Sequence, residues 1–188
     1  FRPQHWRAWS TAFGGSQSLR GDPVVGSIDA SNRTLGGAGG FDYQVSRNLL
    51  LGFAAAGTST EFSVPGLSTS GRLEAAHLGA YGAYRWGATH VAGTLSYSHF
   101  ENDTNRTISG VGPTETAKGQ FGSDQFGGRL QVGHKFMFDR VAVTPFAAVQ
   151  YTQLWQRAYT ETSSAGFGVP GILGLSFQSR SISSLPTF

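Results

Sequence analysis

The sequence predicts an all-β protein, an antiparallel up-and-down transmembrane β-barrel. Three observations predict this fold: apolar and polar residues alternate along most segments, short turns alternate with long polar links, and only 13% of the 188 residues are charged. Ordinary soluble domains carry about 25% charged residues. A barrel with lipid outside and a polar interior needs few, and residues 1–188 are the length of a single domain.

Eight segments have the residue pattern of strands, and none has the 3.6-residue periodicity of an amphipathic helix. They are Trp6–Gly15, Ser31–Tyr43, Asn48–Thr58, Arg72–Trp86, His90–Phe100, Gln120–Phe136, Val141–Thr152 and Ile172–Arg180. The longest apolar run, Leu49 to Gly57, is far shorter than the roughly 20 residues that a membrane-spanning helix needs. A membrane crossing would therefore use strands.

Alternation is clearest in the hairpin that the fourth and fifth segments form. Side chains on a strand point to opposite faces with period 2. One face of the fourth segment is apolar and ends in two aromatic residues: Ala76, Leu78, Ala80, Gly82, Tyr84 and Trp86. The opposite face carries the polar residues, and after a tight turn the same division continues through the fifth segment.

The second and sixth segments repeat this division. In the sixth, the apolar residues Phe126, Leu130, Val132 and Phe136 alternate with polar ones. The apolar faces are rich in glycine and alanine, which would fill the interior of a soluble barrel poorly, and aromatic residues lie near strand ends as in an interfacial girdle. We therefore expect the apolar face to meet lipid and the polar face to line a wet lumen.

Eight residues share the polar face and are the predicted lumen-facing set. They are Asp42, His77, Tyr81, Arg85, Gln125, Arg129, Gln131 and Lys135. A charged side chain facing lipid at the bilayer midplane would cost about 2–4 kcal/mol, so the face of each charge is constrained. Two roles stay open for this set: a solvated, mutually paired lumen, or contact with a polypeptide that passes through it.

The connections between segments alternate in length. The predicted short turns are QVSRN, WGATH and MFDR, and the predicted long links are SQSLRGDPVVGS, STEFSVPGLSTSG, ENDTNRTISGVGPTETAKG and YTETSSAGFGVPG. In an up-and-down sheet all short turns then lie at one end. This asymmetry is typical of outer-membrane barrels, which have short periplasmic turns and longer external loops.

No motif predicts catalysis, a cofactor or a metal site. Gly-x-Ser-x-Gly does not occur, and the chain has no cysteine for thiolate ligands. The histidines lack metal-ligand spacing: His5, His77, His90, His99 and His134. The 14 basic residues are scattered singly rather than gathered into a nucleic-acid-binding stripe. We expect no enzyme activity, no cofactor, no metal and no nucleic-acid partner.

Several segments, in this order, resemble the translocator domain of autotransporters, the type V secretion family of Gram-negative outer membranes. They are WRAWSTAFGG, GGAGGFDYQVSRNLLLGFAAAGTSTEF, HLGAYGAYRWGATHVAGTLSYSHF, RLQVGHKF and VTPFAAVQYTQ. The resemblance implies a twelve-stranded barrel in the cell outer membrane that exports an N-terminal passenger. It also implies three partners: outer-membrane lipid, the protein's own passenger domain and the barrel-assembly machinery. Since eight strands are visible, we expect the barrel to be truncated at its C-terminus here.

Two other interpretations stay open from sequence. A complete small outer-membrane barrel with an adhesin or structural role would suit the even number of eight strands. A soluble β-sandwich, acting as a binding module, would hide the apolar face inside instead of turning it to lipid.

Overall fold

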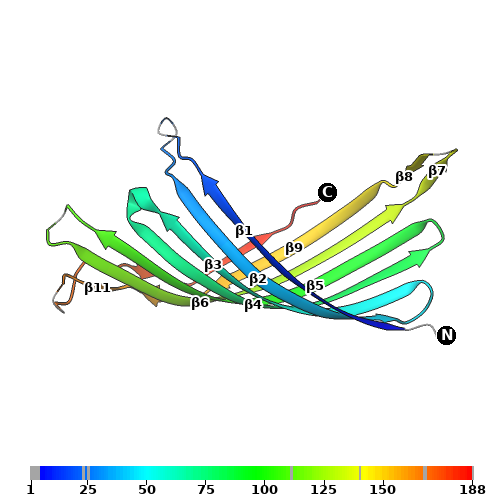
Figure 1. The fold of residues 1–188 in the computed structure, drawn as a ribbon, viewed down its shortest axis with the longest axis horizontal. Helices are drawn as coiled ribbons and strands as arrows, with labels where there is room; N and C mark the ends of the chain where they lie inside the picture. The colour runs from blue at the N-terminus through cyan, green and yellow to red at the C-terminus, as the bar shows by residue number, and fades with distance from the viewer. Residues whose placement is uncertain are drawn as a thin grey trace.

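The structure is a computed structural model that describes residues 5–22, 24, 26–110, 112–139, 141–166 and 169–187. Its main element is a curved antiparallel sheet of nine strands (Figure 1). Along the sheet lie β1 (Trp6–Leu19), β2 (Ala30–Gln44), β3 (Leu49–Val64), β4 (Thr69–Trp86), β5 (Thr89–Ile108), β6 (Glu115–His134), β9 (Phe146–Gln156) and β13 (Arg180–Ser184). β11 (Thr162–Ser164) pairs with the start of β6. In the described part of the chain, β1 and β13 do not pair with each other, so the sheet is open.

From β1 to β6 each strand pairs with the next one in sequence, which confirms the predicted up-and-down order. The pairing of β5 with β6 runs without interruption from Thr89↔His134 to Ile108↔Glu115. The registers of the other neighbouring pairs from β1 to β5 are equally continuous. Without a bulge to shift the side chains, each residue keeps the face that its parity gives it.

Two of the predicted long links are mostly strand, so the prediction of long loops there was wrong. β3 continues to Val64 and β4 begins at Thr69, joined by the 3-10 turn η1 (Pro65–Leu67). β5 continues to Ile108 and β6 begins at Glu115. The backbone N–H and C=O groups of these polar stretches hydrogen-bond to the neighbouring strand. The stretches lack the apolar alternation by which a strand is recognised in sequence. The two ends of the sheet therefore still differ, but because the strands themselves are longer at one end and not because long loops lie there.

The predicted short turn MFDR is present, but it is tighter than predicted, since Phe138 already pairs with Val141 across it. β7 (Phe136–Phe138) and β8 (Val141–Val143) pair with each other as a separate two-stranded sheet. Pro145 precedes β9 and has no N–H to donate to the main ladder, which explains why the pairing is interrupted there. Arg140, the last residue of the predicted turn, lies outside the described residues.

The last predicted strand is displaced. Within the predicted segment Ile172–Arg180, only β12 (Ser176–Phe177) and the first residue of β13 are strand. β12 pairs with β10 (Tyr159–Thr160), away from the main sheet. Figure 1 shows β11 and the chain around it at the opposite end of the sheet from β7 and β8.

The described residues enclose almost no apolar core. Their buried apolar residues are Ala75, Ala117 and Ala148, and none of their large side chains is fully buried. Large apolar side chains are exposed instead, for example Leu78 at 62% and Phe53 at 68%. A soluble sandwich would bury such side chains between two sheets. No helix among the described residues is long and apolar enough to cross a membrane.

Candidate functional site: an apolar band and a polar face

The apolar face is the face that bears Phe41, Leu78 and Leu130. The register lines up large side chains from neighbouring strands on it. One row joins Phe41, Phe53, Ala80, Leu95, Gly128 and Tyr151. The next row on this face includes Leu78, Tyr97 and Phe126. The side chains of six adjacent strands therefore form one continuous apolar surface.

The height of this surface follows from β4. On its apolar face no charge occurs from Trp86 back to Ala76, and the next two residues on the face are Glu74 and Arg72. These eleven residues, 76 to 86, span about 37 Å along the strand at about 3.4 Å per residue. A tilt of about 45° reduces this to roughly 25 Å, the apolar height of an outer-membrane barrel. We call this surface the apolar band.

The opposite face, which bears Asp42, Tyr81 and Arg129, is the polar face. One cross-strand row on it consists of Arg7, Asp42, Gly52, Tyr81, Thr94, Arg129 and Gln150. Residues opposite one another in an antiparallel sheet lie on the same face, close enough to interact. This row crosses the sheet at the height of the apolar band.

A hydrogen-bonded network joins β1, β2 and β4 on the polar face. Asp42 is buried, at 4% exposure, and accepts bonds from Arg7 Nε at 3.0 Å and Arg7 Nη2 at 2.6 Å. The Tyr81 hydroxyl donates to the other carboxylate oxygen of Asp42 and accepts from Trp9 Nε1 at 3.1 Å. A buried carboxylate needs such compensation, so the network fixes the three strands relative to one another.

Two aromatic rings of this network lie over glycines on neighbouring strands. A Cβ atom at Gly52 would lie 2.3 Å from Tyr81 Cζ, and one at Gly40 would lie 2.4 Å from Trp9 Cε2. A side chain at either position would force the ring to move, because real Cβ atoms essentially never approach another atom so closely. In each pair the aromatic ring packs on the glycine of the neighbouring strand and shields its backbone, a known way of stabilising glycines in sheets.

The other predicted lumen-facing residues distribute along the polar face. His77 Nε2 pairs with Thr58 Oγ1 at 3.1 Å and His77 Nδ1 with Ser98 Oγ at 2.8 Å, and Gln125 is opposite Ser98 in the same row. Arg129 Nη2 donates to Gln131 Oε1 at 3.1 Å. Arg85 shares the parity of Tyr81 near the end of β4, and Lys135 directly follows β6 at that same end.

Sequence reasoning missed Arg7 and Trp9 as members of the polar network. The signal was present in WRAWS, where Arg7 and Trp9 alternate with Trp6 and Ala8. A tryptophan ranks as an apolar residue, so its ring nitrogen did not count as a polar contact. Only the pairing of β1 with β2 brings the Arg7 guanidinium opposite Asp42.

Beyond the apolar band, the chain after β9 folds back onto the polar face of β6. The Tyr159 ring stacks between Phe121 at 4.1 Å and Phe177 at 4.6 Å, measured between ring centroids. Arg106 Nη2 pairs with the buried carboxylate of Glu161 at 2.6 Å. These contacts attach the β10–β12 segment, residues 159–166 and 169–177, to the extended part of the sheet.

Glu115 provides a further attachment of this segment. It is buried, and its carboxylate accepts bonds from the backbone N–H of Leu173 at 3.0 Å and of Ile172 at 3.1 Å and 3.2 Å. These donors, the Leu173 N–H foremost, hold the pKa of Glu115 below its usual value although burial opposes them. Glu115 lies at the start of β6, far beyond the apolar band.

Comparison with known proteins identifies this arrangement. The family described as autotransporter beta-domain matches residues 8–187, nearly the whole chain. The chain belongs to the autotransporter β-domain family. As its sequence suggested, this β-domain is an outer-membrane translocator domain, located in the outer membrane of a Gram-negative bacterium.

Curated relatives of this β-domain are much longer proteins. Outer membrane protein A of Rickettsia conorii and of Rickettsia rickettsii are each 27% identical to it over 168 residues, which is 84% of this chain. The chain spans only 8% and 7% of their respective lengths. It corresponds to a small part of each.

Solved structures share its fold. The translocator domain of the autotransporter NalP from Neisseria meningitidis superposes with a TM-score of 0.77 at 18% identity, covering 98% of this chain and 60% of that one. The ferric yersiniabactin uptake receptor FyuA from Yersinia pestis superposes with a TM-score of 0.61 at 11% identity, covering 98% of this chain and 32% of that one. At these identities the likeness concerns the fold of the β-domain alone.

The two faces differ in chemistry, because one is apolar over most of its height and the other carries hydrogen-bonded polar side chains. Within the described residues, no group of three or more His, Asp or Glu side chains is arranged to hold a metal ion. The acidic groups described above are instead engaged by arginine, tyrosine or backbone N–H donors. The polar face of the β-domain can hold water and contact a polypeptide.

Proposed function

We propose that this β-domain anchors a longer protein in the outer membrane and that its polar face lines the passage for an N-terminal passenger. The observation that carries the proposal is the division of the same strands into two faces. One face presents a band of roughly 25 Å that carries no charge on β4, and the other presents the row of Arg7, Asp42, Tyr81 and Arg129 at the same height.

Outer-membrane lipid is the proposed partner of the apolar band. Side chains there, such as Leu130 at 55% exposure, have no protein cover in the described residues. Contact with acyl chains carries no free-energy penalty for these side chains, whereas contact with water does. The barrel-assembly machinery is the second proposed partner, because a sheet with open edges cannot enter lipid unaided without exposing unpaired backbone groups.

The domain itself is proposed to be non-enzymatic, with any catalytic activity carried by the passenger. The acidic and histidine side chains of the polar face make contacts that hold strands together: Asp42 with Arg7 and Tyr81, and His77 with Thr58 and Ser98. None of these contacts pairs a serine or threonine nucleophile with a histidine that a carboxylate orients, as hydrolysis would require.

A pair of neighbouring cysteines tests the orientation. In the full-length protein, Gln131→Cys on the polar face should react with a membrane-impermeant thiol reagent, and Leu130→Cys on the apolar face should react only with a lipid-soluble one. The two positions are adjacent in β6, so they share depth and differ only in face. Equal reaction of both with the impermeant reagent would contradict the proposed orientation.

A stalled passenger tests the passage. When a tightly folded reporter arrests export, the chain in transit should protect Gln131→Cys from the impermeant reagent and form a cross-link with it. Leu130→Cys supplies the matched control, because its reaction with the lipid-soluble reagent should not change. If arrest leaves Gln131→Cys as reactive as before, the passenger does not pass along the polar face.

A further inference from the structure

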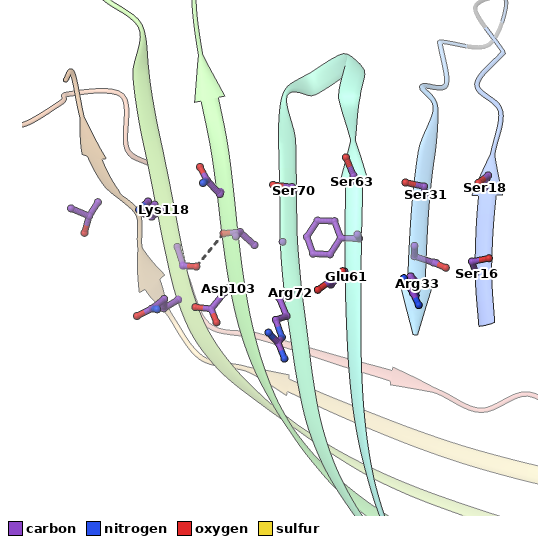
Figure 2. Close-up of a pocket in the computed structure, with 18 of the residues that line it drawn as sticks. Ser16, Ser18, Ser31, Arg33, Glu61, Ser63, Ser70, Arg72, Asp103 and Lys118 are labelled. Atoms are coloured by element: carbon purple, nitrogen blue, oxygen red, sulfur yellow. Dashed lines mark hydrogen bonds between the residues drawn. The ribbon is translucent and has the colours of Figure 1, made fainter. Parts of the chain in front are cut away.

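A polar groove lies on the outer side of the sheet beyond the apolar band. Its volume is ≈ 1080 Å³, and two complete cross-strand rows line it. One row is Ser16, Arg33, Glu61, Arg72, Asp103 and Gln120; the other is Ser18, Ser31, Ser63, Ser70, Asn105, Lys118 and Thr162. Figure 2 shows the labelled members side by side across the extended strands.

Parity places both rows on the same face as the apolar band. Ser70, Arg72, Glu74, Ala76 and Leu78 succeed one another on one face of β4, which pairs with its neighbours without a bulge. The surface that meets acyl chains is therefore continuous with the groove. A molecule embedded beside the band by its acyl chains would reach the groove with its headgroup.

The height of the groove selects the kind of headgroup. Arg72 and Ser70 lie four and six residues beyond Ala76, which is roughly 10 Å and 14 Å above the band at the same strand tilt. A phospholipid headgroup layer adds only about 5–7 Å to each side of the hydrocarbon core. The groove lies above that layer, at a level that an extended, sugar-bearing headgroup reaches.

The side chains of the groove suit a phosphorylated saccharide. Arg33 and Lys118 offer charged donors for phosphate or carboxylate groups, and Arg72 adds a third guanidinium that also pairs with Glu74 at 2.6 Å. Glu61 and Asp103 accept hydrogen bonds from sugar hydroxyls, and the row of four serines can donate or accept. Across the sheet the charges alternate in sign from Arg33 to Glu61, Arg72 and Asp103. Such a surface matches the mixed donors, acceptors and charges of a phosphorylated sugar.

We propose that this groove binds the sugar and phosphate headgroup of an outer-leaflet glycolipid whose acyl chains cover the apolar band. The inference rests on the proposed lipid-facing orientation of that band. Arg33 and Lys118 lie at opposite ends of the groove, on β2 and β6, so a bound headgroup would span the outer ends of five strands.

The test measures glycolipid retained by the full-length protein after extraction from cells and washing in detergent, by mass spectrometry and phosphate assay. Arg33→Gln and Lys118→Gln should each lower retention by about threefold or more, as expected for loss of one exposed ionic contact. Arg47→Gln is the matched control, because Arg47 lies in the short turn after β2, at the other side of the band. Equal retention by all three variants would overturn the proposal.

Three further outcomes discriminate the occupant. A cysteine at Ser63 should be protected from a thiol reagent in nanodiscs that contain lipopolysaccharide, and not in nanodiscs of phospholipid alone. Protection by the free oligosaccharide at equal concentration, without acyl chains, would overturn the glycolipid assignment in favour of a soluble sugar. Protection that requires the passenger would overturn it in favour of a protein contact. If these experiments fail while Gln131→Cys and Leu130→Cys behave as described above, the membrane orientation stands and only the groove assignment falls.

Discussion

At the scale of single residues, glycines decide which rings can lie on the polar face. Tyr81 lies over Gly52 and Trp9 over Gly40, and similar contacts join Phe13 to Gly36. In each case the ring and the glycine come from neighbouring strands. Glycine weakens an isolated strand, but here the missing side chain gives the ring its place.

Gly52→Ala should destabilise the barrel by about 1–3 kcal/mol, the usual cost of forcing extra atoms into a packed site. The new Cβ would displace the Tyr81 ring and pull its hydroxyl from Asp42. The urea midpoint of unfolding in detergent micelles measures the effect in the full-length protein. Gly57→Ala is the control, because its nearest neighbour, the Ala75 carbonyl oxygen, is 4.0 Å away. Equal midpoints for both variants would show that the ring contact has no energetic role.

The Tyr81 hydroxyl should stabilise the barrel through its hydrogen bond to Asp42, separately from the packing of the ring on Gly52. Tyr81→Phe keeps the ring over Gly52 and removes the bonds to Asp42 and Trp9. We expect Tyr81→Phe and Asp42→Asn to be non-additive, with the double variant less destabilised than the sum of the two, as groups in one network are. Unfolding midpoints of the four proteins give the coupling, and strict additivity would contradict a shared network.

At the scale of elements, Glu115 couples the β10–β12 segment to pH. Its pKa is lowered in the folded state from an ordinary value of 4.5, chiefly by the Leu173 N–H. A carboxyl whose folded pKa is depressed stabilises the folded state above its unfolded pKa. That stabilisation is lost as the pH falls through the folded value. The segment should therefore remain attached at neutral pH and loosen below about pH 4.5.

Hydrogen exchange of the Ile172 and Leu173 amides, corrected for intrinsic rates, measures this attachment. Protection should be constant between about pH 7 and pH 5 and fall below that range. Glu115→Gln should lower protection at neutral pH and remove the acid-dependent fall, since it carries no titrating carboxyl. Protection of the native protein that persists unchanged to about pH 3 would contradict the role of Glu115.

At the scale of the whole molecule, the open edges of the sheet make its closure the central question. In lipid each unpaired backbone group costs several kcal/mol, so neither β1 nor β13 can face acyl chains with its outer edge bare. Eight strands closed on themselves leave an interior only wide enough for side chains. The polar face carries groups as large as Trp9, Tyr81 and Arg129, which favours closure by further strands of the same protein.

We therefore predict that residues 1–188 alone insert poorly into membranes. The full-length protein, with all the strands that its sheet needs for closure, should give a protease-resistant barrel with heat-modifiable mobility on gels. The measurement is that mobility shift, with trypsin resistance as a second readout. A stable barrel from residues 1–188 alone, with β1 cross-linked to β13 through introduced cysteines, would favour the small eight-stranded barrel instead.

The faces of the strands were predictable from sequence because they depend on a local rule. Alternation with period 2 separates Leu130 from Gln131 whichever strand lies beside them. The order of the strands followed from short turns such as Gly87–Ala88, where Gly87 takes the positive φ of 60° that a tight hairpin turn needs. These features require no knowledge of distant contacts.

Other features depended on the register between strands. The polar stretches after Thr58 and Phe100 have no apolar alternation, and only pairing with their neighbours makes them strand. The register also brings Arg7 to Asp42, 35 positions away in the chain. It aligns Arg33, Glu61, Arg72 and Asp103 from four strands into one row of the groove.

The side-chain pattern within each strand was enough to predict an up-and-down sheet with one apolar face and one polar face. Contacts between strands set how far the strands extend beyond the apolar band, which side chains meet on each face, and where the polar groove lies. The physical reason is that backbone pairing satisfies polar strands as well as apolar ones, while the identity of the paired residues is set by contacts between distant parts of the chain.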